Sequence, residues 1–283
     1  MACFTWRSIF KRLALIIAWN LFLAVSDSSA TLAQSKASLD EKFHQAIFEH
    51  VQGNYDLALH ELIEALDISR QSKSDYDEGR CLLWLGITSW DIGNLQGSLG
   101  YFNKATKTFV QIGDKITREF CLKCRLIIEL YLKGKADRDA QLNYSSLNSF
   151  EQGILLGREL GIPDFEQKLV RQKGLTYLQL GELALFFECN QRGLDIAEKI
   201  NHTIEKGRCL NNIGAYYQKN NDYSLALAYF ERAISQLDSI NDLTTRAECL
   251  SNLGVLYRDI GYHEKALGYF LKALKVDKLR ADD

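Results

Sequence analysis

The pattern that decides the fold reads RCLNNIGAYYQKNNDYSLALAYFERA at residues 208–233 and ECLSNLGVLYRDIGYHEKALGYFLKA at residues 248–273. Cys209-Leu210, Asn212 and Gly214 of the first copy each recur at the same place in the second. A period of about 40 residues marks a stacked repeat array, in which one unit cannot bury its apolar face alone.

Each copy is predicted to form two helices. In the second copy, Leu250, Leu253 and Tyr257 recur at three- and four-residue spacing, which places them on one helix face. Gly261 then ends that helix, because glycine adopts the left-handed conformation at a helix end without steric cost. Phe270 lies in the second helical stripe. The repeated unit is therefore a helix hairpin.

The motif L-G-x-x-Y followed by A-x-x-x-F-x-x-A resembles the tetratricopeptide repeat. The period of about 40 residues and the missing terminal proline differ from the 34-residue form of that repeat. They resemble the longer repeats of kinesin light chains and of bacterial Rap-type peptide-sensing regulators. The resemblance covers residues 38–280 and implies an all-α, right-handed α-solenoid of about six helix hairpins. It also implies a scaffold for protein–protein interaction, since this fold mainly presents a binding surface.

Six repeats are expected, at about residues 38–77, 78–117, 118–164, 165–204, 205–244 and 245–280. The third repeat carries about eight extra residues, which we predict at Lys135 to Leu142 as a surface loop or a lengthened helix start. Glycine or asparagine recurs where each helix should end, at Gly53, Gly93, Gly113, Gly161, Gly181, Asn201, Asn221, Asn241 and Gly261.

Composition narrows the classes of function. The net charge of −2 lacks the basic excess of a nucleic-acid binder. The five histidines show no metal-ligand spacing, and no phosphate loop or nucleophile elbow is present in the sequence. We therefore expect a protein that is not an enzyme, has no cofactor or metal, and binds a protein or peptide partner.

Four cysteines, Cys81, Cys121, Cys209 and Cys249, occupy one repeat position and are expected to be small buried thiols. Stacked helices place such positions about 10 Å apart, beyond the ~7 Å limit for a disulfide. Cys121 and Cys124 also form a C-x-x-C motif, for which a redox or zinc role is the alternative.

The N-terminus has the layout of a secretory signal peptide. Basic residues precede an apolar run at residues 13–25, and small polar residues follow at 26–34. We expect cleavage near Ala33, removal of residues 1–33, only transient membrane contact, and export to the periplasm or the medium of a bacterium. An uncleaved membrane anchor and a buried N-terminal helix are the alternatives.

The first helices of the repeats are expected to line a concave groove. Its N-terminal half offers Trp84 and Trp90, for which packing at repeat junctions is the alternative. Its C-terminal half is polar, and a solvated helix face is the alternative there; the candidates are Lys168, Arg171, Arg208, Asn211, Asn212, Asn252 and Arg258.

The resemblance implies that Asn212 and Asn252 hydrogen-bond the backbone of an extended peptide. An amide suits this role because it both donates and accepts. The arginines are predicted to hold carboxylates, which favours an acidic peptide.

A rival interpretation starts from the last predicted helix. Leu271 stands where the preceding repeat has Glu231, and it lies beside Leu267 and Leu274. An apolar face of this kind indicates self-association into a homo-oligomer, or a repeat region belonging to a larger signalling protein.

Overall fold

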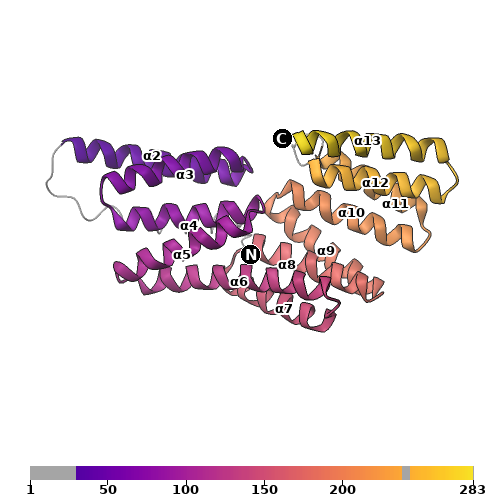
Figure 1. Ribbon diagram of the computed structural model, residues 1–283, viewed down its shortest axis with the longest axis horizontal. Coiled ribbons are helices and arrows are strands. Elements are labelled where there is room, and N and C mark those ends of the chain that lie inside the picture. Colours follow the sequence, from indigo (N-terminus) through magenta and orange to yellow (C-terminus); the bar gives the residue numbers. More distant parts are fainter. Residues whose placement is uncertain (1–29, 238–242, 283) are drawn as a thin grey trace, which may run out of the picture. The chain divides into compact units, whose positions relative to one another are not determined.

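In this computed structural model the described residues are 30–237 and 243–282, and all their secondary structure is helical (Figure 1). The helices are α2 (Ala30–Gln52), α3 (Tyr55–Gln71), α4 (Asp75–Asp91), α5 (Leu95–Gln111), α6 (Lys115–Asp139), α7 (Asn143–Leu160), α8 (Pro163–Gln179), α9 (Leu183–Ile200), α10 (Thr203–Lys219), α11 (Tyr223–Leu237), α12 (Leu243–Asp259) and α13 (His263–Asp282).

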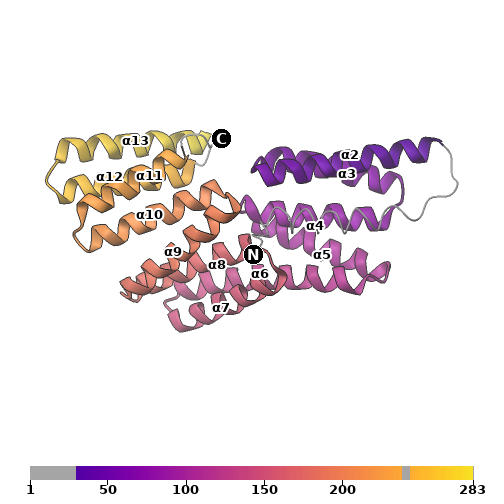
Figure 2. The same ribbon diagram turned by 180° about the vertical axis from the view of Figure 1, so that it is seen from behind.

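The chain divides into two compact units, with the boundary inside α6 between Ile128 and Glu129. Within each unit, a helix packs beside the next one in the chain, as α4 with α5 and α12 with α13 (Figures 1 and 2). In the second unit α10 also contacts α8 and α12. These contacts confirm the predicted all-α, helical-repeat solenoid class.

The two helices of a hairpin approach closely where glycine meets an aromatic ring. A Cβ atom added to Gly214 would lie 2.7 Å from the ring of Phe230, closer than real side chains come. The same contact is made by Gly86 with Phe102, Gly134 with Phe150 and Gly254 with Phe270. Glycine is needed here for space, because any side chain would force the helices apart.

The helix ends follow the predicted glycine and asparagine positions. Eight of those nine positions have positive φ, at Gly53, Gly93, Gly113, Gly161, Gly181, Asn201, Asn221 and Gly261. The ninth, Asn241, lies outside the described residues. Lys73 and Gln141 adopt the same conformation without glycine or asparagine, so these two helix ends were missed.

The predicted position of the eight extra residues was wrong. Cys121 and Gly134 of α6 are the equivalents of Cys81 and Gly86 of α4, and the extra residues separate the members of the α6 pair. The insertion therefore lies inside α6, which has 25 residues against 17 in α4. Eight residues make about 2.2 helical turns, so the helix continues through the insertion and its face is rotated by about 80° beyond it.

Residues 1–29, which include most of the predicted signal segment, lie outside the described residues, and α2 begins at Ala30. None of the described helices has the length and apolar composition to cross a bilayer.

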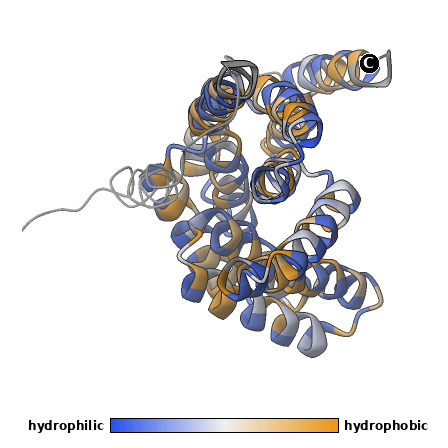
Figure 3. Ribbon diagram, turned by 90° about the vertical axis from the view of Figure 1, so that its left-hand side faces the viewer, coloured by the Kyte–Doolittle hydropathy of each residue, from blue (hydrophilic) through white to orange (hydrophobic). Residues whose placement is uncertain are grey.

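Hydropathy explains how the helices pack. Apolar and polar residues alternate around the helices in Figure 3. In the second unit, the apolar sides of α9 to α13 join in three clusters, and Phe230 lies in the cluster shared by α11 and α12. The polar sides of α8, α10 and α12 are the setting of the candidate site.

Candidate functional site

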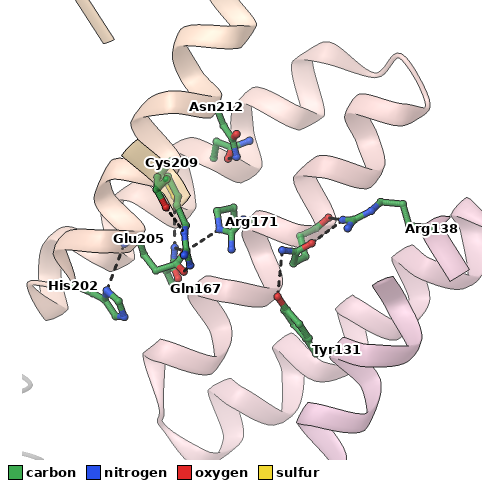
Figure 4. Close-up of polar contacts among 12 residues, drawn as sticks. Tyr131, Arg138, Gln167, Arg171, His202, Glu205, Cys209 and Asn212 are labelled. Carbon is green, nitrogen blue, oxygen red and sulfur yellow. Dashed lines mark hydrogen bonds and ion pairs between the residues drawn. The ribbon is translucent and has the colours of Figure 1, made fainter. Parts of the chain in front are cut away.

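A buried carboxylate organises the polar side of α8 and α10 (Figure 4). Glu205 is 0% exposed. Its Oε2 accepts hydrogen bonds from Nε of Arg171 at 2.8 Å and from Nε2 of Gln167 at 3.0 Å. Its Oε1 accepts a hydrogen bond from Nη1 of Arg208 at 2.7 Å. Two guanidinium groups and an amide thus hold one acidic side chain.

The electrostatics keep this cluster charged. Burial alone would raise the pKa of Glu205, but Arg171 and Arg208 hold that pKa well below its usual range. Burial likewise lowers the pKa of Arg171, and the carboxylate of Glu205 more than reverses this, so the net direction is upward. The ion pair is therefore fully formed at neutral pH.

Local sequence spacing builds the cluster. Gln167 and Arg171 are four residues apart in α8, and Glu205 and Arg208 are three apart in α10, so each pair shares a helix face. Glu205 lies in the first turn of α10, where the helix dipole favours a negative charge. His202 precedes the helix, and its Nδ1 accepts a hydrogen bond from the backbone N–H of Glu205.

A second polar group links α6 to α8 within the same unit. Nη1 of Arg138 donates to Oε1 of Gln172 at 2.8 Å, and Nε2 of Gln172 donates to the hydroxyl of Tyr131 at 3.3 Å. Burial lowers the pKa of Arg138. Gln172 lies one repeat period before Asn212, so this glutamine is the first of three amides at one repeat position.

The other two amides are Asn212 and Asn252, both half-buried. Nδ2 of Asn212 donates to Oδ1 of Asn190 at 2.8 Å, and Nδ2 of Asn252 donates to Oδ1 of Asn211 at 3.0 Å. Asn190 and Asn211 are themselves buried. Each of the two half-buried amides is thus held in one orientation by a buried one. We call Gln172, Asn212 and Asn252 the amide row.

Comparison with protein families agrees with this architecture. Two tetratricopeptide-repeat models match the chain, one at residues 165–239 and one at 246–276. These two matched regions together cover less than half of the chain, and they are similar to the tetratricopeptide repeat. No curated protein sequence matches it significantly.

Solved structures share this helical-repeat fold. A Rap protein complexed with competence and sporulation factor has a TM-score of 0.51 at 14% identity, over 87% of this chain and 76% of that one. The apo form of RapI has a TM-score of 0.50 at 14% identity, over 87% of this chain and 99% of that one. The Rap conjugation gene regulator of plasmid pLS20, in complex with the Phr* peptide, has a TM-score of 0.51 at 15% identity, over 90% of this chain and 65% of that one. Together with the repeat models, these likenesses show a helical-repeat fold of the tetratricopeptide type.

The structure sorts the predicted basic residues by depth. Lys168 and Arg171 are buried, and Arg171 forms an ion pair with the buried Glu205. Arg208 is half-buried and divides its contacts between Glu205 and the Thr245 hydroxyl. Arg258 is exposed and pairs with its neighbour Asp259 in α12.

The remaining candidates divide in the same way. Asn211 is buried beneath Asn252, which is the accessible member of that pair. In the first unit Trp90 is only 1% exposed and Trp84 is also buried, with its ring centroid 5.4 Å from that of His50. Both tryptophans thus pack inside the unit, which is the alternative that the sequence left open.

The cysteines have the predicted buried character. The six described cysteines are free, and all but Cys189 are buried. Burial raises the pKa of Cys121 to about 12 and raises the pKa of Cys124 well above its usual value. A C-x-x-C motif active in redox chemistry has a lowered thiol pKa instead. The pKa directions therefore argue against the redox alternative for this pair.

Proposed function

We propose that the second unit binds an extended peptide segment of a protein partner along the amide row. The observation that carries this proposal is the pair of half-buried amides, Asn212 and Asn252, held in fixed orientation by buried asparagines. Two amides one repeat period apart, on neighbouring first helices, offer the alternating donors and acceptors that a peptide backbone needs. Orientation before binding reduces the entropy lost when the peptide docks.

An acidic peptide suits this surface best. Arg208 and Arg258 lie on the same helices as the two amides and keep exposed area. The internal contact of Glu205 with Arg171 and Arg208 illustrates how a carboxylate is held between guanidinium groups on this side of α10. The Rap regulator of plasmid pLS20, which is described in complex with the Phr* peptide, supports a peptide as the partner through likeness of fold.

The proposed role is non-catalytic and requires no cofactor. Binding energy then comes from hydrogen bonds and charge pairs, and the buried thiols act only as packing groups. We also propose that the protein is exported after cleavage near Ala33. Mass spectrometry of the protein isolated from its host should find an N-terminus near Gln34, and an intact Met1 on a cytoplasmic protein would refute export.

Selection from a peptide library, followed by calorimetry, tests the binding site. We expect selected peptides to be rich in Asp and Glu. The double variant N212A/N252A should weaken binding by about 1–3 kcal/mol, because buried polar groups of the complex lose their partners. Asn103→Ala in α5, exposed and in the first unit, is the matched control and should leave affinity unchanged.

A surface variant that keeps the fold shows whether affinity is lost because the binding site changes or because the protein unfolds. Arg258 is exposed, so Arg258→Glu leaves the fold intact while it reverses one charge on α12, the helix that carries Asn252. It should weaken acidic peptides and spare neutral ones. Equal binding of acidic peptides to the wild type, to R258E and to a folded N212A/N252A variant would rule out this surface.

A further inference from the structure

Three leucines form an exposed stripe along α13. Leu267, Leu271 and Leu274 are 59%, 57% and 50% exposed. Their spacing of four and three residues places them on one face of the helix. Contiguous apolar surface of this kind is the usual mark of an interaction site.

The preceding repeat shows what covers such a face. Leu227 and Ile234 of α11 lie one repeat period before Leu267 and Leu274. They are half-buried, because two apolar clusters that both contain residues of α12 pack against them. Among the described helices, α13 packs against α12. The buried side chains of α13, such as Ala273 and Val276, make this contact, and the three leucines do not. The face that α12 covers on α11 is therefore left open on α13 within the described part of the chain.

Leu271 strengthens this interpretation of α13. The corresponding residues of α11 and α9 are Glu231 and Gln191, both exposed and polar. The other two repeats make no internal packing contact at this position, so Leu271 is not needed for the packing of the hairpin. It completes a continuous apolar stripe instead.

The charges at the two ends of the stripe are opposite. Glu264 lies three residues before Leu267, and Lys278 lies four residues after Leu274, so both continue the spacing of the stripe. Both side chains are exposed. Glu264 and Lys278 also lie at the same sequence distance from Leu271, on either side of it.

This arrangement is self-complementary only in an antiparallel pair. A two-fold axis at Leu271 brings Glu264 of each copy beside Lys278 of the other and closes the leucine stripes on each other. A parallel pair would instead bring like charges together at both ends, which is unfavourable. A symmetric contact uses one surface twice and closes after two copies.

We propose that α13 is a dimerisation surface, and that its occupant is α13 of a second copy of this chain, packed antiparallel about Leu271. Analytical ultracentrifugation of the purified protein tests this. The wild type should sediment at twice its chain mass at micromolar concentration. Leu271→Lys should raise the dissociation constant at least a hundredfold. Leu155→Lys in α7, at a leucine 55% exposed, is the matched control and should leave the dimer intact.

Charge reversal tests the orientation. E264K should weaken the dimer about tenfold, because it places lysine against Lys278, and the double variant E264K/K278E should restore wild-type affinity. Circular dichroism melting curves confirm that each variant is folded. The proposal is overturned by a monomeric wild type at ~100 μM, by a dimer that L271K leaves unchanged, or by a double variant that stays weak.

Discussion

Helices α4 and α10 begin with nearly the same sequence but build opposite charge arrangements. Asp77-Glu-Gly-Arg80-Cys-Leu opens α4, and Glu205-Lys-Gly-Arg208-Cys-Leu stands at the same place in α10. In both helices the acid and the arginine three residues later form an ion pair, at 2.7 Å in each case. The shared residues thus set the same local frame in both units.

The two ion pairs differ in the charged side chain that a neighbouring helix adds to each of them. In α4, Nη2 of Arg80 also reaches Oδ1 of Asp40 in α2, at 3.3 Å, so one buried arginine lies between two carboxylates. In α10, Glu205 also accepts from Arg171 of α8, so one buried carboxylate lies between two arginines. The repeat position therefore fixes the packing, while the first helix of the preceding repeat decides the sign of the local charge. This difference supports the proposed preference of the second unit for an acidic ligand.

Replacing the acid of each ion pair with alanine should give the largest difference in stability loss between α10 and α4. Glu205→Ala leaves the buried guanidinium of Arg171 without its carboxylate and should cost about 3–5 kcal/mol of stability. Asp77→Ala should cost less, about 1–3 kcal/mol, because Arg80 keeps Asp40. Urea denaturation measures both losses, and Glu231→Ala at an exposed position is the control. Equal losses for the two acids would contradict the proposed difference.

Substitution of the glycine that contacts phenylalanine should destabilise both units to a similar extent. Gly86→Ala and Gly214→Ala place a Cβ 3.0 Å and 2.7 Å from a phenylalanine ring, and each should cost about 1–3 kcal/mol. Gly268→Ala in α13 meets nothing within 4 Å and should be neutral or stabilise by up to about 1 kcal/mol, through helix propensity alone. Thermal melts check the set; a loss confined to one unit would argue against a common frame.

The pH dependence of stability should report the Glu205 cluster. The pKa of Glu205 is lower in the folded protein than in the unfolded chain, so its ionisation stabilises the fold above the unfolded pKa, which is about 4.3. That stabilisation is lost as pH falls towards the folded pKa, by at most about 1.4 kcal/mol per pH unit. Urea titrations between pH 7 and 3 should show the wild type converging on Glu205→Gln. A constant difference between them would disprove the linkage.

The cysteines that follow the two arginines should be equally inert. Burial raises the pKa of both Cys81 and Cys209 to about 12. At pH 8 roughly one thiol in ten thousand is then ionised, so native-state reaction with a disulfide reagent should be slow compared with that in urea. Mass spectrometry of the labelled sites is the measurement. Rapid native labelling of one cysteine but not the other would show that the frames differ.

The sequence predicted the hairpins because their information is local and periodic. Cys209, Asn212 and Gly214 recur at the same places in the next repeat, and the helix ends carry glycine or asparagine. The insertion in α6 was misplaced because the added residues continue the helix. Such an insertion introduces no turn residues and no composition change to mark its position.

The site was predicted less completely than the fold. The amide positions were found because asparagine repeats at Asn212 and Asn252. Glu205 was missed, since an acid in a first helical turn resembles a solvated residue. Its pairing with Arg208 three residues later was readable, but its contact with Arg171 joins residues 34 apart and depends on how α8 meets α10. Burial depth, which removes Trp90 and Arg171 from the surface, likewise arises only from packing between helices.

The contact between each glycine and the ring opposite it has a consequence for how such a chain grows. Gly214 and Phe230 belong to one hairpin, as do Gly254 and Phe270. Tandem duplication of one hairpin segment therefore copies the glycine together with the phenylalanine that it contacts, so the closest contact of the new hairpin is already formed. Lengthening or shortening of the gene by whole segments is tolerated by the packing in a way that substitution at a single one of these glycines is not.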